Sequence, residues 1–174
     1  VSFNYISTGY SSSTSNTHTF TSQDIGTDTD GRQILVGIGW KSNNGSASIS
    51  SVTVGGESCT EVIQKVRTAS GENNPGSAFF VIDDDPAFGT SENIVVSFDS
   101  SVLVCRIYVI AMFCADLSPF ATNFDASNSS PMDVSTNTTD DGAIFSVFTC
   151  KPNGDLNIAA ITELGEYDNG TDNF

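Results

Sequence analysis

Hydrophobic residues recur at every second position in short runs along this chain, and they seldom show the spacing of a helix. Alternation of this kind is typical of β-strands, and clusters of Gly, Asn, Asp, Ser and Pro between the runs are typical of turns. The pattern predicts an antiparallel all-β protein built from strands at residues 3–7, 18–22, 32–40, 51–54, 60–66, 77–82, 93–98, 105–113, 132–136, 142–149 and 156–162.

Two of these strands have the pattern expected of central strands. Residues 32–40 (RQILVGIGW) are apolar on both faces, and residues 105–113 (CRIYVIAMF) form the longest apolar strand. Trp40 ends the first of them, so we expect it in the core or at its rim. The residues that the alternation directs inwards, and that we expect to be largely buried, are Val36, Ile38, Val52, Val54, Ile94, Val96, Ile107, Val109 and Phe145.

A pair of glycines, Gly55 and Gly56, interrupts two alternating runs in the stretch ISSVTVGGESCTEVIQ. A phosphate-binding loop would need a helix to begin after the glycines. The residues that follow are instead β-branched and alternating, and glycine pairs supply the positive φ angles of a tight hairpin. The pair therefore predicts a turn between two strands.

The 174 residues suit one domain with a single core, which we place over residues 1–174. The chain carries 21 acidic and 6 basic residues, a formal net charge of -15. Nucleic acids and anionic lipid surfaces would repel such a charge. No apolar run reaches the roughly 18–20 residues that span a bilayer. The sequence therefore predicts neither a nucleic-acid partner nor a membrane partner.

The sequence contains few candidate catalytic residues. His18 is the sole histidine, it lies in a Ser/Thr-rich segment, and we expect it at the surface or at a strand edge. Serine or cysteine catalysis would have to use this residue. The four cysteines are widely spaced, which favours free thiols in a cytosolic protein over two disulfides. The sequence predicts a protein that is not an enzyme.

Acidic residues cluster in three loops, DTDG at 28–31, DDDPAFG at 83–89 and TDDG at 139–142. Asp is a common turn residue, so these clusters are explained by loop structure. A Ca²⁺ site at Asp28 and Asp30 is the sharper alternative, because their carboxylates are suitable ligands. The EF-hand pattern would need Glu where Gly37 stands. We otherwise predict no cofactor.

Three stretches of the chain resemble β-sandwich domains in structural proteins of tailed bacteriophages. They are DIGTDTDGRQILVGIGWKSNNGSASISSVTVGGESCTEVIQ, FFVIDDDPAFGTSENIVVSF and CRIYVIAMFCA, within a likeness over residues 17–167. The resemblance implies a two-sheet antiparallel sandwich, jelly-roll or Ig-like, with no catalytic residues. It also implies a further strand after residues 162–170, supplied by a longer native chain or by a neighbouring copy.

The function that this resemblance implies is structural. We expect a virion protein, made in the cytoplasm of a bacterial host, that decorates or cements the capsid by binding the major capsid protein or other virion proteins. A homo-oligomer such as a trimer is expected. A tail or fibre module that contacts a host receptor or glycan is the alternative. The residues expected to contact partners are Asp83, Asp84, Asp85, Asp140, Asp141, Arg32 and Arg106.

Overall fold

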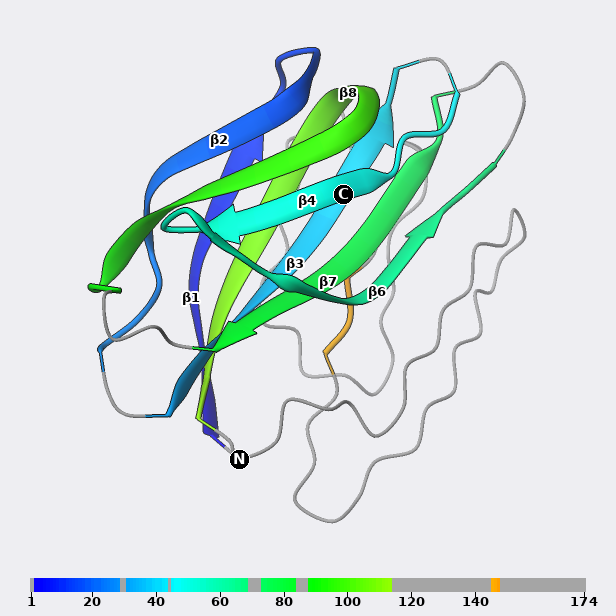
Figure 1. Ribbon diagram of the computed structural model, residues 1–174. Coiled ribbons are helices and arrows are strands. Elements are labelled where there is room, and N and C mark those ends of the chain that lie inside the picture. Colours follow the sequence, from blue (N-terminus) through cyan, green and yellow to red (C-terminus); the bar gives the residue numbers. More distant parts are fainter. Residues whose placement is uncertain are drawn as a thin grey trace.

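The structure, a computed structural model, describes residues 2–28, 31–43, 45–68, 73–83, 88–113 and 145–147. These ranges contain eight strands and no helix (Figure 1). All named strand pairs are antiparallel, and the sheet curls until it is nearly closed into a barrel. The strands are β1 Ser2–Ser11, β2 Ser15–Asp24, β3 Arg32–Ser42, β4 Ile49–Val54, β5 Glu57–Ser58, β6 Thr60–Val66, β7 Pro75–Asp83 and β8 Ser91–Phe113. The predicted antiparallel all-β class is confirmed.

β8 is the central element of the fold, and it belongs to two groups of strands. Its first part pairs with β2 on one side and β4 on the other. Its second part pairs with β1 and β3, and β3 continues the sheet through β7 to β6. In Figure 1 the two parts of β8 join at a sharp bend. The curled shape of the sheet follows from this bend.

The sequence predicted two separate strands, at 93–98 and 105–113, where the structure has one strand of 23 residues. The polar residues Asp99, Ser100 and Ser101 suggested a break. They stay extended because the neighbouring segment supplies backbone partners. The Asp99 amide donates to the Ser48 carbonyl (3.0 Å), and the Ser101 carbonyl accepts from the Asn43 amide (3.0 Å).

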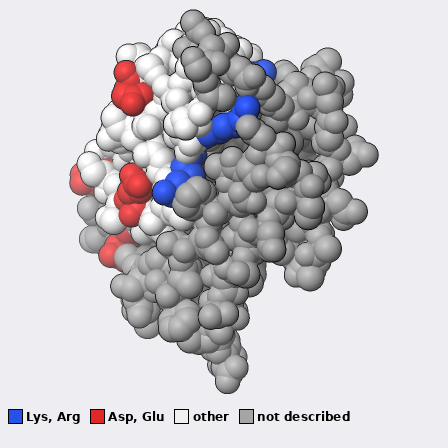
Figure 2. Space-filling view, turned by 90° about the vertical axis from the view of Figure 1, so that its right-hand side faces the viewer, with Lys and Arg blue, Asp and Glu red and all other residues white. Residues whose placement is uncertain are grey.

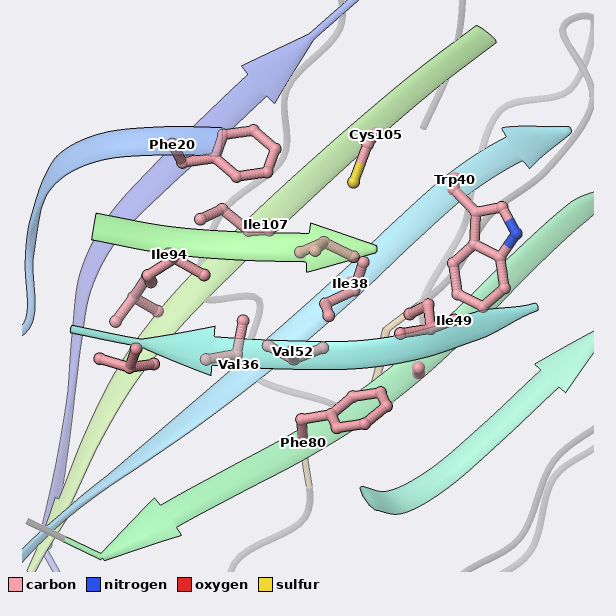
Figure 3. Close-up of a cluster of buried hydrophobic side chains, with 14 of the residues drawn as sticks. Phe20, Val36, Ile38, Trp40, Ile49, Val52, Phe80, Ile94, Cys105 and Ile107 are labelled. Atoms are coloured by element: carbon pink, nitrogen blue, oxygen red, sulfur yellow. The ribbon is translucent and has the colours of Figure 1, made fainter. Parts of the chain in front are cut away.

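The main hydrophobic core fills the inside of the curled sheet. Figure 3 shows side chains of β3, β7 and the second part of β8 meeting those of β4 and the first part of β8. Trp40 is fully buried, and its indole N–H donates to the Ala47 carbonyl (2.8 Å). The predicted core residues on β3, β4 and β8 are all confirmed as buried: Val36, Ile38, Val52, Val54, Ile94, Val96, Ile107 and Val109.

A second apolar cluster covers the opposite, outer face of β3, β7 and β8. It consists of Leu35, Phe79, Val81, Ile110 and Met112. Phe145 and Val147 pack against this cluster and are partly buried. Phe145, which the sequence predicted to be largely buried, is thus partly buried, and it contacts the outer cluster and not the main core. Burial from both sides explains why β3 is apolar at nearly every position.

Gly55 and Gly56 form the turn between β4 and β5, as the sequence predicted. Their φ angles are 59° and 97°, in the region that favours glycine. β4 leads into the turn with Val52 and Val54 buried and Ser51 exposed. The glycine pair is therefore a hairpin turn.

Two of the four cysteines, Cys59 and Cys105, lie in the described ranges, and both are free. Burial raises the pKa of the Cys59 thiol to about 12 and raises that of Cys105 as well. Both side chains are therefore neutral thiols at pH 7 and poor nucleophiles. The prediction of free thiols is confirmed for these two residues, whereas Cys114 and Cys150 lie outside the described residues.

The predicted strands at 132–136 and 156–162 also lie outside the described residues. Of the predicted strand at 142–149, only residues 145–147 are described, and they have no regular secondary structure. No helix in the described ranges is long and apolar enough to cross a membrane.

Candidate functional site

Two of the acidic loops that the sequence pointed to come together at one end of the sheet. The loop after β2 and the loop before β8 are joined by a backbone hydrogen bond from the Ile25 amide to the Thr90 carbonyl (2.9 Å). The Asp24 carboxylate accepts from the Gly26 amide (2.8 Å) and so fixes the start of the first loop. We call this end of the molecule, which the structure describes at residues 24–28 and 31 and at residues 83 and 88–90, the acidic end.

Arg32, at the first position of β3, holds the acidic end together from inside. Its side chain is 1% exposed, and its guanidinium donates to the carbonyls of Gly26 (2.8 Å) and Gly89 (3.0 Å). One side chain thus connects both loops. Arg32, one of the residues expected to contact partners, thus anchors two loops of its own chain.

Two of the acidic candidate residues at the acidic end lie within the described ranges, the Ca²⁺ candidate Asp28 and the contact candidate Asp83. Asp28 is exposed. Asp83, also exposed, accepts from the Gln33 side-chain amide (3.3 Å) across the β3–β7 pair. The remaining candidates, Asp30, Asp84, Asp85, Asp140 and Asp141, lie outside the described residues.

The Ca²⁺ alternative at Asp28 and Asp30 involves one described residue and one outside the described ranges. Among the residues that the structure describes, no group of three or more His, Cys, Asp or Glu side chains is arranged to hold a metal ion. The Ca²⁺ alternative stays a prediction.

Arg106 lies far from the acidic end, in the middle of the second part of β8. It is 2% exposed, and its guanidinium carbon stands 4.9 Å from the centre of the Tyr10 ring on β1. A cation over an aromatic face is a favourable contact. Tyr10 itself is 44% exposed, so the ring covers the cation on the solvent side.

Four of the six basic residues lie on one face of the sheet, which the sequence analysis did not find. We call Lys41, Lys65, Arg67 and Arg106 the basic patch. Figure 2 shows Lys and Arg side chains in a band on one face, with Asp and Glu side chains in several separate places, one of them beside an end of the band. Strand register is the signal that reveals the patch, because its members come from β3, β8, β6 and the residue that follows β6, and the three strands are far apart in sequence.

His18 was expected at the surface or at a strand edge. It lies on β2, which pairs with β8 alone among the described strands, but the ring is 2% exposed, so a place at the surface is wrong. Its Nε2 donates to the Ser15 carbonyl (3.3 Å), and its Nδ1 shares a hydrogen bond with the Ser11 hydroxyl (2.9 Å). The ring also meets Phe98 edge to face, with the centres 5.9 Å apart. The overlooked signal is alternation: His18 lies two residues before Phe20, which faces the core.

Burial lowers the pKa of His18 below its usual value of 6.5. The folded protein therefore holds a neutral ring, while the unfolded chain takes up a proton as the pH falls below 6.5. We expect the free energy of unfolding to decrease between pH 7 and pH 5.5, since the unfolded state binds more protons there. Most carboxylates titrate below this window.

Urea unfolding at the two pH values measures this effect. The His18→Gln variant lacks the titrating group, so its stability should change less over the same interval. A wild-type protein whose stability is constant or rises between pH 7 and 5.5 would contradict the expected role of this ring.

Comparison with protein-family models, with curated proteins and with solved structures finds no match for this chain. The described residues form two candidate functional surfaces, the acidic end, organised by Arg32, and the basic patch on the outer face of the sheet.

Proposed function

We propose that the protein is a structural component of a bacteriophage virion, one that decorates or cements the capsid. The acidic end is the observation that carries this proposal. It presents the exposed carboxylates of Asp28 and of Asp83, the last residue of β7, beside two loops that Arg32 and the Ile25–Thr90 hydrogen bond hold in place. The resemblance of residues 17–167 to phage structural domains supports the same conclusion. No catalytic role and no cofactor form part of the proposal.

The fold within this proposal is a two-sheet sandwich of jelly-roll or Ig-like type. The support for it is the pairing of β8, whose two parts have different neighbours, β2 and β4 for one and β1 and β3 for the other. Each part would then belong to its own sheet, with the main core between them.

Binding to the shell would work through many copies of a modest contact. A specific interface buries roughly 1,200–2,000 Å² in total, and several linked copies raise the holding strength of each. With a formal net charge of -15, the protein requires a basic surface or bound cations on its partner. Loops fixed on rigid strands present their carboxylates without a large ordering cost.

Stripping the protein from particles and adding it back at rising salt tests the proposal. We expect saturable rebinding at low salt, weaker binding as salt rises, and decorated shells that resist heat better than bare shells. Asp28→Asn and Asp83→Asn should each weaken binding about 1.5- to 5-fold, the effect of one exposed ion pair. Glu57→Gln, on exposed β5, is the matched control and should leave binding unchanged.

Two results would contradict the capsid proposal. One is rebinding that does not depend on salt. The other is saturable binding to host cell envelopes with none to shells, which would establish the tail or fibre module that contacts a host receptor or glycan.

A further inference from the structure

The basic patch lies at the end of the sheet opposite the acidic end. Antiparallel register places Lys65 of β6 opposite Ser77 of β7, and Ser77 opposite Gly39 of β3. Gly39 in turn lies opposite Arg106 of β8. Lys41 is two residues beyond Gly39, and the Arg67 amide donates to the Pro75 carbonyl (3.0 Å) at the same end. With neighbouring strands about 4.8 Å apart, the four cations lie within roughly 15 Å.

All four side chains project from the outer face of the sheet. The residues next to them in sequence face the main core: Trp40 beside Lys41, Val66 beside Lys65 and Arg67, and Cys105 and Ile107 beside Arg106. Because successive side chains of a strand point to opposite faces, the patch shares its face with the second apolar cluster. Among the described residues, register places one carboxylate on this face, that of Asp83, six residues along β7 from Ser77.

The acidic charge that could complement the patch is concentrated late in the sequence. Residues 114–174 hold ten of the 21 acidic residues and one of the six basic residues. Within them, residues 148–174 carry Asp155, Glu163, Glu166, Asp168 and Asp172, with Lys151 as the one basic residue. Opposite charges attract, and more strongly where the surface is partly shielded from water.

Just before this acidic segment, the chain lies on the outer face of the sheet, the face that carries the basic patch. Phe145 and Val147 pack against the second apolar cluster, which includes Phe79. Phe79 is two residues along β7 from Ser77, and hence about 7 Å from the row of the patch that contains Lys65 and Arg106. The residues after Val147 therefore start within reach of the cations, and this attachment gives them a high effective concentration there.

We propose that the accessible cations of the basic patch, Lys41, Lys65 and Arg67, are the docking surface for the acidic segment 148–174 of the same chain, while Arg106 lies buried beneath Tyr10 beside them. The outer face then consists of two adjoining parts, an apolar one occupied by Phe145 and Val147 and a basic one occupied by the segment that follows. This inference does not depend on the capsid proposal, because it concerns contacts within one molecule.

Zero-length carbodiimide cross-linking of the full chain tests the docking, since the reagent couples an amine only to a carboxylate that it touches. An equal mixture of ¹⁴N- and ¹⁵N-labelled protein separates links within one molecule from links between two. At low salt we expect links from Lys41 or Lys65 to carboxylates of 148–174 within one molecule. Their yield should fall several-fold at about 0.5 M salt, where charges are screened over a few ångströms.

A pair of variants separates attraction by charge from accidental proximity. Arg67→Gln removes one cation of the patch and should lower the yield of these links about 1.5- to 5-fold, while Arg67→Lys keeps the charge and should preserve the yield. Glu57 and Glu92, which lie elsewhere on the described surface, serve as reference carboxylates.

Three outcomes would overturn the proposal. Links from Lys41 and Lys65 that go mainly to the reference carboxylates would place the acidic segment elsewhere. Links found mainly in mixed-isotope pairs would make a second copy the occupant. An absence of links from both lysines to residues 148–174 at low salt would show that the acidic segment does not dock on the patch.

Discussion

Trp40→Ala is expected to lower the free energy of unfolding by about 4 kcal/mol, the largest effect of any single truncation considered for this protein. The indole ring is fully buried, and its centre lies 5.5 Å from the centre of the Phe98 ring. Its N–H donates to the Ala47 carbonyl. A Cβ at Gly76 would overlap the ring, which shows how closely β7 packs against it. Alanine would leave a cavity that such a closely packed site fills poorly.

Urea unfolding followed by far-ultraviolet circular dichroism measures this loss, because the variant lacks the only tryptophan. Trp40→Phe keeps an apolar ring and should recover much of the stability. Tyr10→Ala, which truncates a 44% exposed ring, should cost under about 1 kcal/mol. A loss below 1 kcal/mol for Trp40→Ala would mean that the indole does not fill the core.

Arg32→Met should lower the free energy of unfolding by about 3 kcal/mol. Methionine keeps much of the aliphatic volume but cannot donate to the Gly26 and Gly89 carbonyls, and a hydrogen bond from a charged donor contributes about 1.5–3 kcal/mol. The loops of the acidic end would lose their shared anchor. Hydrogen exchange at Ile25, whose amide bonds to Thr90, should therefore accelerate more than exchange in β4.

Lys41→Met is the matched control for this substitution, because Lys41 is a basic residue near the other end of the same strand and is only half-buried. Its effect on stability should stay within about 0.5 kcal/mol. Equal losses for the two variants would contradict the role assigned to Arg32.

Local patterns in the sequence predicted the inward face of each strand well. Alternation identified Val52 and Val54 as buried, and the glycine pair after them identified the turn. The two-sided apolar run at 32–40 became β3, which lies between β7 and β8. The alternation of apolar and polar residues and the residue types of a turn are properties of residues close in sequence. They can therefore be found without any tertiary information.

Features that depend on distant partners could not be found in this way. The continuity of β8 through Asp99 and Ser101 depends on Asn43 and Ser48, which are more than 50 residues away. The basic patch depends on the register of strands that are far apart in sequence. The acidic end depends on the hydrogen bonds by which the Arg32 side chain joins two loops. His18 was misjudged because its polar neighbours concealed the alternation with Phe20.

The length of β8 also sets the order in which a newly made chain can fold. β1 pairs with the second part of β8, from Ser2 opposite Phe113 to Ser11 opposite Cys105, so its partner is synthesised about 100 residues later. At roughly 5–20 residues per second, the first strand waits about 5–20 s for that partner. Contacts so distant in sequence also slow folding after synthesis. During this interval the apolar strand β3 lacks β8 too, so the nascent chain is most exposed to aggregation before residue 113 emerges from the ribosome.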